Sequence, residues 1–328
     1  MKRAASQFVF CILLALAVSP AASGEYLVKE NPQRYRVTID YGLRVVKNPP
    51  PVLVLNLALP TGNDYQDVAN LRCSAGQVLN HPETGDPYLH IEYGVGECAV
   101  GDMSPVRREF DITLYDIRVD FDKIGTIHPY NRNSDLYRRY TRSSKNVDVN
   151  HPGVSRLANA VRIEAANDLD YARRAYELVA RTFRYAGEGD IKSLDDVFES
   201  GAGNCGSLSA VYVAVLRRRG IPARALLGYY TNGKEHIYAE FYLENYGWIP
   251  VDVTHRIDHP DVDYFGRVYG PKAVIILSRD LNLTVKSYNG MNTVKGMQRS
   301  RFFWRNRSER NKSKVEQYLN RLTSEKIG

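Results

Sequence analysis

Residues 199–254, ESGAGNCGSLSAVYVAVLRRRGIPARALLGYYTNGKEHIYAEFYLENYGWIPVDVT, decide the fold that the sequence predicts. Their first part carries apolar side chains at helical spacing, which indicates one buried face; these are Leu208, Val211, Tyr212 and Val215. An arginine triplet followed by Gly220 and then Pro222 marks the end of that helix. The helix therefore begins at Cys205, and Asn204 is placed to be its N-cap.

Cys205 lies in the first turn of this predicted helix. Unpaired backbone N–H groups and the helix dipole stabilise negative charge there, so its thiol is expected to ionise more readily than a free cysteine. The Gly-Ala-Gly-Asn approach frees the backbone around Cys205, which a buried structural cysteine does not require. A thiolate nucleophile also needs a base close by and a third group that orients the base.

The segments after the helix supply both groups. Residues 224–230 are typical of a strand, and Asn232-Gly233 is a strong signal for a two-residue hairpin turn. The returning strand alternates from His236 onward, and after a second turn the chain reaches Asp252. These two side chains share one face only if the second connection keeps the parity of the strands, which favours an odd loop or a bulge.

The motifs GxGNCxxLSAxxxAxLRxxGIPAR, EHxYAExYL and GWIPVDVT follow one another in this order. In these residues the chain resembles the transglutaminase-like superfamily of papain-type cysteine enzymes, over residues 150–285. The resemblance implies that Cys205 is the nucleophile, His236 the base and Asp252 the orienting acid. Many members carry Trp two residues after the histidine, where this chain has Tyr238, so the shape of the substrate site is expected to differ more than the chemistry.

The three residues together imply acyl transfer through a thioester. Cys205 would attack a carboxamide carbon, and His236 would protonate the leaving amine. The backbone N–H of Cys205 is expected to be one oxyanion donor, and Tyr185 is a candidate for the second. No cofactor is expected for this chemistry.

Zinc binding is the competing interpretation of the same residues. Cys205, His236, His255 and His259 are possible ligands, and the last two are spaced to share a helix face. However, the second cysteine of a zinc pair is missing, and Pro260 argues against a helix that continues there. We therefore predict no metal site. The sequence also contains no phosphate loop or dinucleotide fingerprint.

The first 24 residues are typical of a secretory signal peptide. Lys2 and Arg3 precede an apolar run from Phe8 to Val18, and small residues follow it. Eleven apolar residues are too few to span a bilayer as an anchor. The sequence therefore predicts a secreted or periplasmic protein.

Residues 25–127 consist of short β-branched and aromatic runs separated by turn signals, which favours an all-β sandwich domain. Bacterial members of the resembling family often carry such a domain ahead of the catalytic one. Three cysteines remain after the signal peptide, and an odd number in an exported chain suggests one pair and one reactive thiol. Cys73 and Cys98 are the expected disulfide, with two buried thiols as the alternative.

Residues 128–152 are polar and are interpreted as a linker. Helical periodicity then returns, so 153–285 is the predicted catalytic domain. The predicted fold class is therefore α+β: a papain/transglutaminase-like core of helices packed on an antiparallel sheet, preceded by the sandwich.

Residues 286–328 form a basic C-terminal tail with 11 Lys/Arg against 3 Asp/Glu, while the whole chain has a formal net charge of +7. The protein's basicity is thus concentrated in this segment. It indicates either contact with an anionic surface or a solvated basic helix without a partner. Phe302, Phe303 and Trp304 are expected to dock it on the core. Nucleic acid is not an expected partner, because the chain is exported and has no binding motif.

Two functions follow from these predictions. The first is an exported cysteine enzyme that acts on amide bonds of a peptide or protein substrate, with hydrolysis favoured over cross-linking because nothing indicates a site for a second amine. The second is a binding or scaffold module on a transglutaminase-like fold that has lost turnover. The intact Cys205, His236 and Asp252 favour the enzyme.

Overall fold

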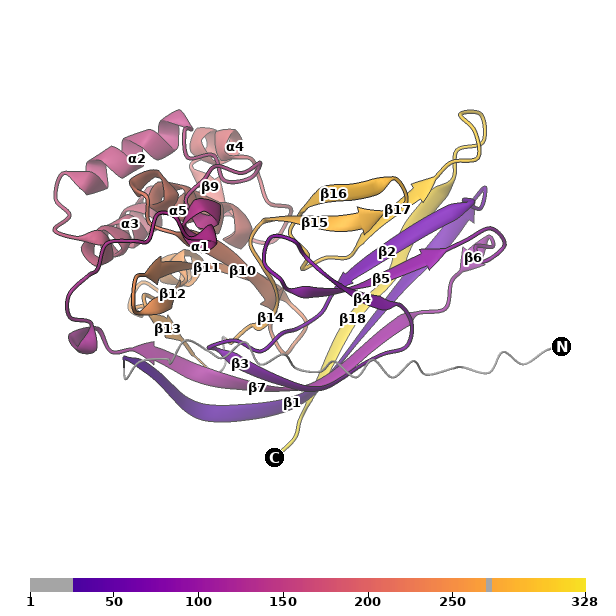
Figure 1. Cartoon of the computed structure of the whole chain (residues 1–328), viewed down its shortest axis with the longest axis horizontal. Coiled ribbons are helices and arrows are strands. Elements are labelled where there is room, and N and C mark those ends of the chain that lie inside the picture. The colour runs from indigo at the N-terminus through magenta and orange to yellow at the C-terminus, as the bar shows by residue number, and fades with distance from the viewer. Residues whose placement is uncertain (1–25, 270–272) are drawn as a thin grey trace.

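The computed structural model describes residues 26–269 and 273–328 (Figure 1). The expected signal peptide at 1–24 lies outside the described residues. The helices are η1 (Phe121–Lys123), α1 (Asp135–Tyr140), α2 (Pro152–Arg162), α3 (Asp168–Thr182), α4 (Leu194–Ser200), α5 (Cys205–Arg219) and α6 (Val253–Asp258). The strands are β1 (Leu27–Lys47), β2 (Val52–Ala58), β3 (Gln66–Cys73), β4 (Gln77–Asn80), β5 (Pro87–Tyr93), β6 (Gly101–Asp102), β7 (Val106–Val119), β8 (Arg184–Tyr185), β9 (Ala202–Gly203), β10 (Ala223–Tyr229), β11 (Glu235–Leu243), β12 (Gly247–Val251), β13 (Arg267–Val268), β14 (Ile275–Arg279), β15 (Asn282–Ser287), β16 (Gly290–Lys295), β17 (Arg301–Arg305) and β18 (Lys314–Lys326).

Helix α5 is the centre of the helical half of the molecule. It begins at Cys205 and ends at Gly220, whose positive φ of 89° suits the left-handed C-cap, as the sequence predicts. Its residues from Gly206 to Arg217 are all buried, because helices α2 and α3 pack on it as well as the sheet. The sequence indicated only one buried face, whereas the helix is enclosed on all sides.

An antiparallel sheet in the order β12-β11-β10-β14 packs against α5. The connection from β10 to β11 has five residues, 230–234, rather than the predicted two-residue turn. The connection from β11 to β12 is residues 244–246, and Leu243 pairs with Gly247. This odd-numbered loop keeps strand parity, as the placement of His236 and Asp252 on one face requires.

The β-rich part of the chain contains two larger sheets. One has the order β13-β7-β1-β18, with β3 and β6 attached, and the other has the order β17-β2-β5-β4. Strands β1 and β7 form a long antiparallel pair below the helical half in Figure 1. The predicted α+β class, with helices on an antiparallel sheet and a large β-rich N-terminal region, is confirmed. The domain boundaries stay predictions.

The basic residues 286–328 form strands rather than the solvated helix considered above. Strand β17 pairs with β2, Phe303 lying opposite Val54, and β18 pairs along β1. In Figure 1 these yellow strands lie beside the indigo strands of the N-terminus. Strands β17 and β18 complete two sheets with partners that precede them by more than 200 residues, whereas β16 pairs with the neighbouring β15.

The expected disulfide between Cys73 and Cys98 is absent: within the described residues the structure contains no bond joining two cysteines. Both side chains are buried in the same apolar cluster. Burial raises the pKa of the Cys98 thiol, which therefore stays neutral and packs as a small apolar group.

Candidate functional site

Cys205 is held at the start of α5 by the loop that precedes it. The Asn204 side-chain oxygen accepts from the backbone N–H of Ser207 at 2.9 Å, and its amide group donates to the carbonyls of Gly189 and Asp190. Gly206 lets the helix start approach the sheet, since a Cβ there would lie 2.9 Å from Ile237 Cδ1. Asn204 thus caps α5 and, with the same side chain, holds the loop at Gly189 and Asp190 against the start of the helix.

The sequence-based expectation of an acidic thiol at Cys205 is wrong for the group by itself. Burial raises its pKa to about 11, and the Asp252 carboxylate adds to this effect. The N–H groups of Ile237 and Gly206 act in the opposite direction by hydrogen bonding to the sulfur. Ionisation of Cys205 therefore requires transfer of its proton to a neighbouring base.

His236 and Asp252 meet as predicted. His236 is the second residue of β11, and Asp252 follows β12 as the N-cap of α6. The distance from His236 Nε2 to Asp252 Oδ2 is 2.6 Å, and both side chains are buried. Cys205 touches the same strand, since its sulfur hydrogen bonds to the N–H of Ile237, the residue after His236.

His255 is a member of this cluster that the sequence indicated only as a zinc ligand. Its Nδ1 lies 2.9 Å from Asp252 Oδ2, and its ring stacks on that of His236 with centroids 4.6 Å apart. Its Nε2 lies 2.7 Å from the hydroxyl of Tyr230. Tyr230 also stacks on His236, at 5.0 Å between centroids. The sequence did contain a signal for this contact: His255 follows the helix-capping Asp252 by three residues, so the first turn of α6 brings the two side chains together.

The hydrogen bonds determine which ring nitrogens carry protons. An ionised carboxylate only accepts, so His236 Nε2 and His255 Nδ1 both donate to Asp252. Burial alone would raise the pKa of Asp252, but the two histidines bring it well below its ordinary value. The neutral His236 ring then has its lone pair on Nδ1, and His255 accepts a hydrogen bond from Tyr230.

Tyr185, the candidate oxyanion donor, lies beside the cluster. Its strand β8 pairs with β9, which leads directly to Asn204 and Cys205. Burial raises the pKa of Tyr185 to about 12, with Cys205 and Asp252 adding to the shift. The hydroxyl of Tyr185 therefore keeps its proton at neutral pH and can donate a hydrogen bond.

The same cluster has the residue types of a metal site. Ligand atoms of His236, Asp252 and His255 lie within 4.8 Å of one another. These atoms already hydrogen bond to one another, and His255 Nε2 to Tyr230, so a metal ion would have to replace those bonds. Neither Cys205 nor His259 joins this set of three, so the zinc set considered above is not assembled.

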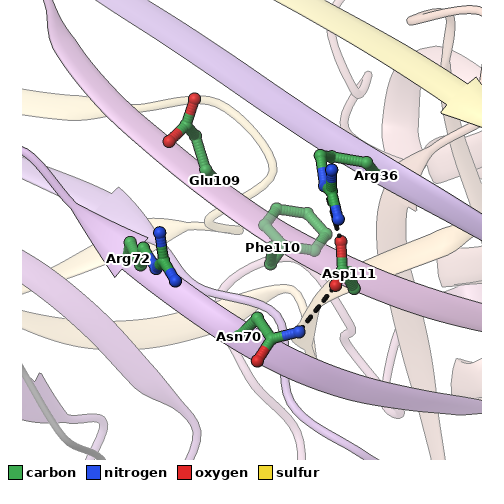
Figure 2. Close-up of a pocket in the computed structure, with 6 residues that line it drawn as sticks. All are labelled: Arg36, Asn70, Arg72, Glu109, Phe110 and Asp111. Carbon is green, nitrogen blue, oxygen red and sulfur yellow. Dashed lines mark hydrogen bonds and ion pairs between the residues drawn. The ribbon is translucent and has the colours of Figure 1, made fainter.

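A cavity of about 320 Å³ opens beside Cys205. A larger hollow, of about 380 Å³, lies on the six-stranded sheet and is shown in Figure 2. There Asp111 accepts hydrogen bonds from Arg36 and Asn70, so its charge is already satisfied. That hollow contains no nucleophile, whereas the one at Cys205 does.

Comparison with known proteins shows what the segment that carries this site is similar to. The model of the transglutaminase-like superfamily matches residues 155–253, which include α5 and the hairpin. Over these residues the chain is therefore similar to the transglutaminase-like superfamily. An uncharacterized protein of Haemophilus influenzae is 31% identical over 93 residues, which cover 20% of this chain and 24% of that protein. The match thus spans about a quarter of that relative's length.

One solved structure extends the likeness of fold beyond the matched segment. A candidate cysteine protease from Cytophaga hutchinsonii has a TM-score of 0.60 and 11% identity, and covers 92% of this chain and 93% of its own. The fold of nearly the whole chain is therefore shared with that protein. The periplasmic domain of TgpA from Pseudomonas aeruginosa has a TM-score of 0.40 and 16% identity, with 73% and 77% of the two chains covered. Among the described residues no helix is long and apolar enough to cross a membrane.

Proposed function

We propose that this protein is a cysteine-dependent amidohydrolase or peptidase that acts through Cys205, His236 and Asp252. The observation that carries the proposal is the 2.6 Å hydrogen bond between His236 Nε2 and Asp252 Oδ2, on the strand whose backbone contacts the sulfur of Cys205. This bond turns the basic Nδ1 of His236 away from the carboxylate.

The reaction begins with proton transfer from the Cys205 thiol to His236 Nδ1. The resulting imidazolium offsets the cost of a partly buried thiolate, and Asp252 stabilises the imidazolium. The sulfur attacks the carbonyl carbon of an amide, and the carbonyl electrons move to oxygen. When the tetrahedral intermediate collapses, the C–N bond breaks and His236 gives its proton to the leaving amine.

Water then completes the cycle. His236 removes a proton from water, hydroxide adds to the thioester carbonyl, and the thiol of Cys205 leaves with a proton as the carboxylic acid forms. The backbone N–H of Cys205, at the head of α5, is a donor for the oxyanion of both steps, and Tyr185 is the proposed second donor. The hydroxyl of Tyr230 is already committed to His255 and is therefore not assigned this role.

Hydrolysis is favoured over cross-linking because the sequence gives no indication of a site for a second amine. Export is part of the proposal, since residues 1–24 have the pattern of a signal peptide. A silent binding module remains the second candidate, and the paired His236 and Asp252 count against it.

Alkylation of Cys205 by iodoacetamide, followed by mass spectrometry between pH 5 and pH 11, tests the proposed base. In wild type the rate is expected to level off near neutral pH, because thiolate and imidazolium form together. In His236→Ala the rate should continue to rise toward pH 11, because burial raises the pKa of the lone thiol to about 11. Cys98→Ala serves as the control and should match wild type.

Two coincident pH profiles for wild type and His236→Ala would refute the proton transfer. The same preparations are assayed on labelled peptide libraries by mass spectrometry. Hydrolysis that is present in wild type and lost in Cys205→Ala supports the enzyme, whereas peptide binding without any turnover would establish the binding module.

A further inference from the structure

The cavity beside Cys205 has a wall that comes from the C-terminal segment. Lys295, Gln298, Arg299 and Arg301 line it together with residues of the α5 start and of β10 and β11. Its volume of about 320 Å³ is at the lower end of the range for ligand pockets, which suits one or two amino-acid residues. The cavity thus extends from the proposed nucleophile into a strongly charged surface.

The wall is anchored to the strands that carry the site. The Gln298 amide donates to the Gly228 carbonyl at 2.5 Å and to the His236 carbonyl at 3.3 Å. The Tyr229 hydroxyl donates to the Gln298 carbonyl at 3.0 Å. Residues 295–301 are therefore fixed relative to His236 by hydrogen bonds from two strands.

The charges of this cavity are unequally paired. Arg299 is occupied, because it bonds to both oxygens of Glu235 and to Asp190 at 2.8–3.0 Å. Lys295 and Arg301 instead donate to backbone carbonyls, and within the described residues neither has a carboxylate partner within 4.0 Å. Burial lowers the pKa of both, and a neighbouring arginine adds to the effect on each. The Asp190 carboxylate acts in the opposite direction on both, but burial outweighs it. Half-buried cations whose hydrogen bonds go to neutral carbonyls, with carboxylates acting on them only from beyond ion-pair distance, favour an anionic ligand.

We propose, on the basis of the proposed function, that Lys295 and Arg301 bind a carboxylate of the substrate next to the amide that Cys205 attacks. The substrate class is therefore an acidic peptide, in which the carboxylate is either an acidic side chain or the free C-terminus. The planar guanidinium of Arg301 suits two hydrogen bonds to one carboxylate, and Lys295 adds a point charge. The basic C-terminal segment thus acts on substrate choice at the site itself.

The test uses the full-length Cys205→Ala variant, so that binding is measured without turnover. Fluorescein-labelled hexapeptide libraries that carry Glu or Gln at one fixed position are titrated by anisotropy, each with a free and with an amidated C-terminus. We expect at least about tenfold tighter binding of one carboxylate-bearing set, the magnitude of a hydrogen bond to a charged group. A difference between the Glu and Gln sets would identify an acidic side chain as the bound group. A difference between the free and amidated sets would identify the C-terminal carboxylate.

Arg301→Gln in the same background should remove the preference, and Arg301→Lys should restore part of it. Arg305→Gln is the matched control, since Arg305 ends the same strand but is exposed and does not line the cavity. Equal affinity for all sets, or a preference that survives Arg301→Gln, would overturn the inference. Failure of the proposed function would appear separately, as wild-type alkylation and hydrolysis that do not depend on His236.

Discussion

The proposed site on the β10–β12 hairpins and the C-terminal segment 286–328 both contribute residues to the cavity beside Cys205. The contacts that hold these two regions in place differ in their separation along the sequence. His236 and Asp252 are 16 residues apart, and a single β-hairpin brings them together. In the C-terminal segment, Arg321 of β18 pairs with Asp40 of β1, 281 residues away. The geometry of the proposed catalytic site therefore depends on local turns, whereas the cavity wall depends on closure of the whole chain. This difference predicts that the two regions respond separately to substitution.

Deletion of residues 314–328 is expected to have the largest effect on stability. It removes β18, leaves one edge of the long strand β1 unpaired, and exposes the cluster that Leu322 covers. We expect a loss on the order of 3 kcal/mol or more in the free energy of unfolding, measured with urea.

The matched control for this deletion is Arg307→Gln/Arg310→Gln, which removes two positive charges from the exposed loop before β18. It should leave the urea midpoint nearly unchanged. If the truncated chain is as stable as the full one, the segment is a tail, as its composition alone suggested.

Asp252→Asn tests the local region and should lower kcat by roughly 10² to 10⁴. Asparagine can still cap α6, so the fold should persist. Its amide, however, presents an N–H group to His236 or His255, and the proton of His236 is then drawn to Nδ1. The kcat for peptide hydrolysis is compared with that of Asp263→Asn, a surface acid paired with Arg173, which should remain close to wild type.

The sequence predicts the α5 start and the hairpin that carries His236 well, because each of their signals lies within a few neighbouring residues. The cap at Asn204, the stop at Gly220 and the alternation from His236 each depend on neighbouring residues. His255 was recognised only as a possible ligand, because its contact with Asp252 needs the first turn of α6. The pKa of the Cys205 thiol was predicted in the wrong direction, because the packed elements around the helix start partly bury this side chain and the helix pattern does not reveal them.

The C-terminal strands could not be predicted in the same way. Strand pairing across more than 200 residues leaves no pattern within the segment beyond alternation, and its many cations indicate a solvated surface. Lys295 and Arg301 line the cavity at the two ends of the connection between β16 and β17, which hydrogen bonds of Gln298 and Gly296 fasten to Gly228 and Leu281.

Gly228→Ala perturbs the contact between the two regions. A Cβ at this position would lie 2.0 Å from the carbonyl oxygen of Ile275, so β10 would have to move from β14. We expect a loss of about 2–3 kcal/mol in the free energy of unfolding. The control is Gly62→Ala, whose added Cβ would lie 3.8 Å from the Gln66 carbonyl and should cost less than about 0.5 kcal/mol. Equal urea midpoints for the two variants would contradict the close packing.

The smallest effect, and the sharpest separation of the two regions, is expected from a pair of adjacent tyrosines. The hydroxyl of Tyr230 donates to His255, while that of Tyr229 donates to the carbonyl of Gln298 in the cavity wall. Tyr230→Phe keeps its ring on His236 but leaves His255 Nε2 without its donor, so kcat should fall about three- to tenfold with KM unchanged.

Tyr229→Phe should instead raise KM for acidic peptides by a similar factor and leave kcat near wild type. It removes the hydrogen bond to Gln298 in the cavity wall but leaves the hydrogen bonds among His236, Asp252 and His255 in place. Both variants keep the buried ring, so their unfolding midpoints should stay close together and exclude a general loss of structure as the cause. If both substitutions lower kcat equally, the wall and the hairpin act as one unit, and the cavity's charge cannot be assigned to substrate binding alone.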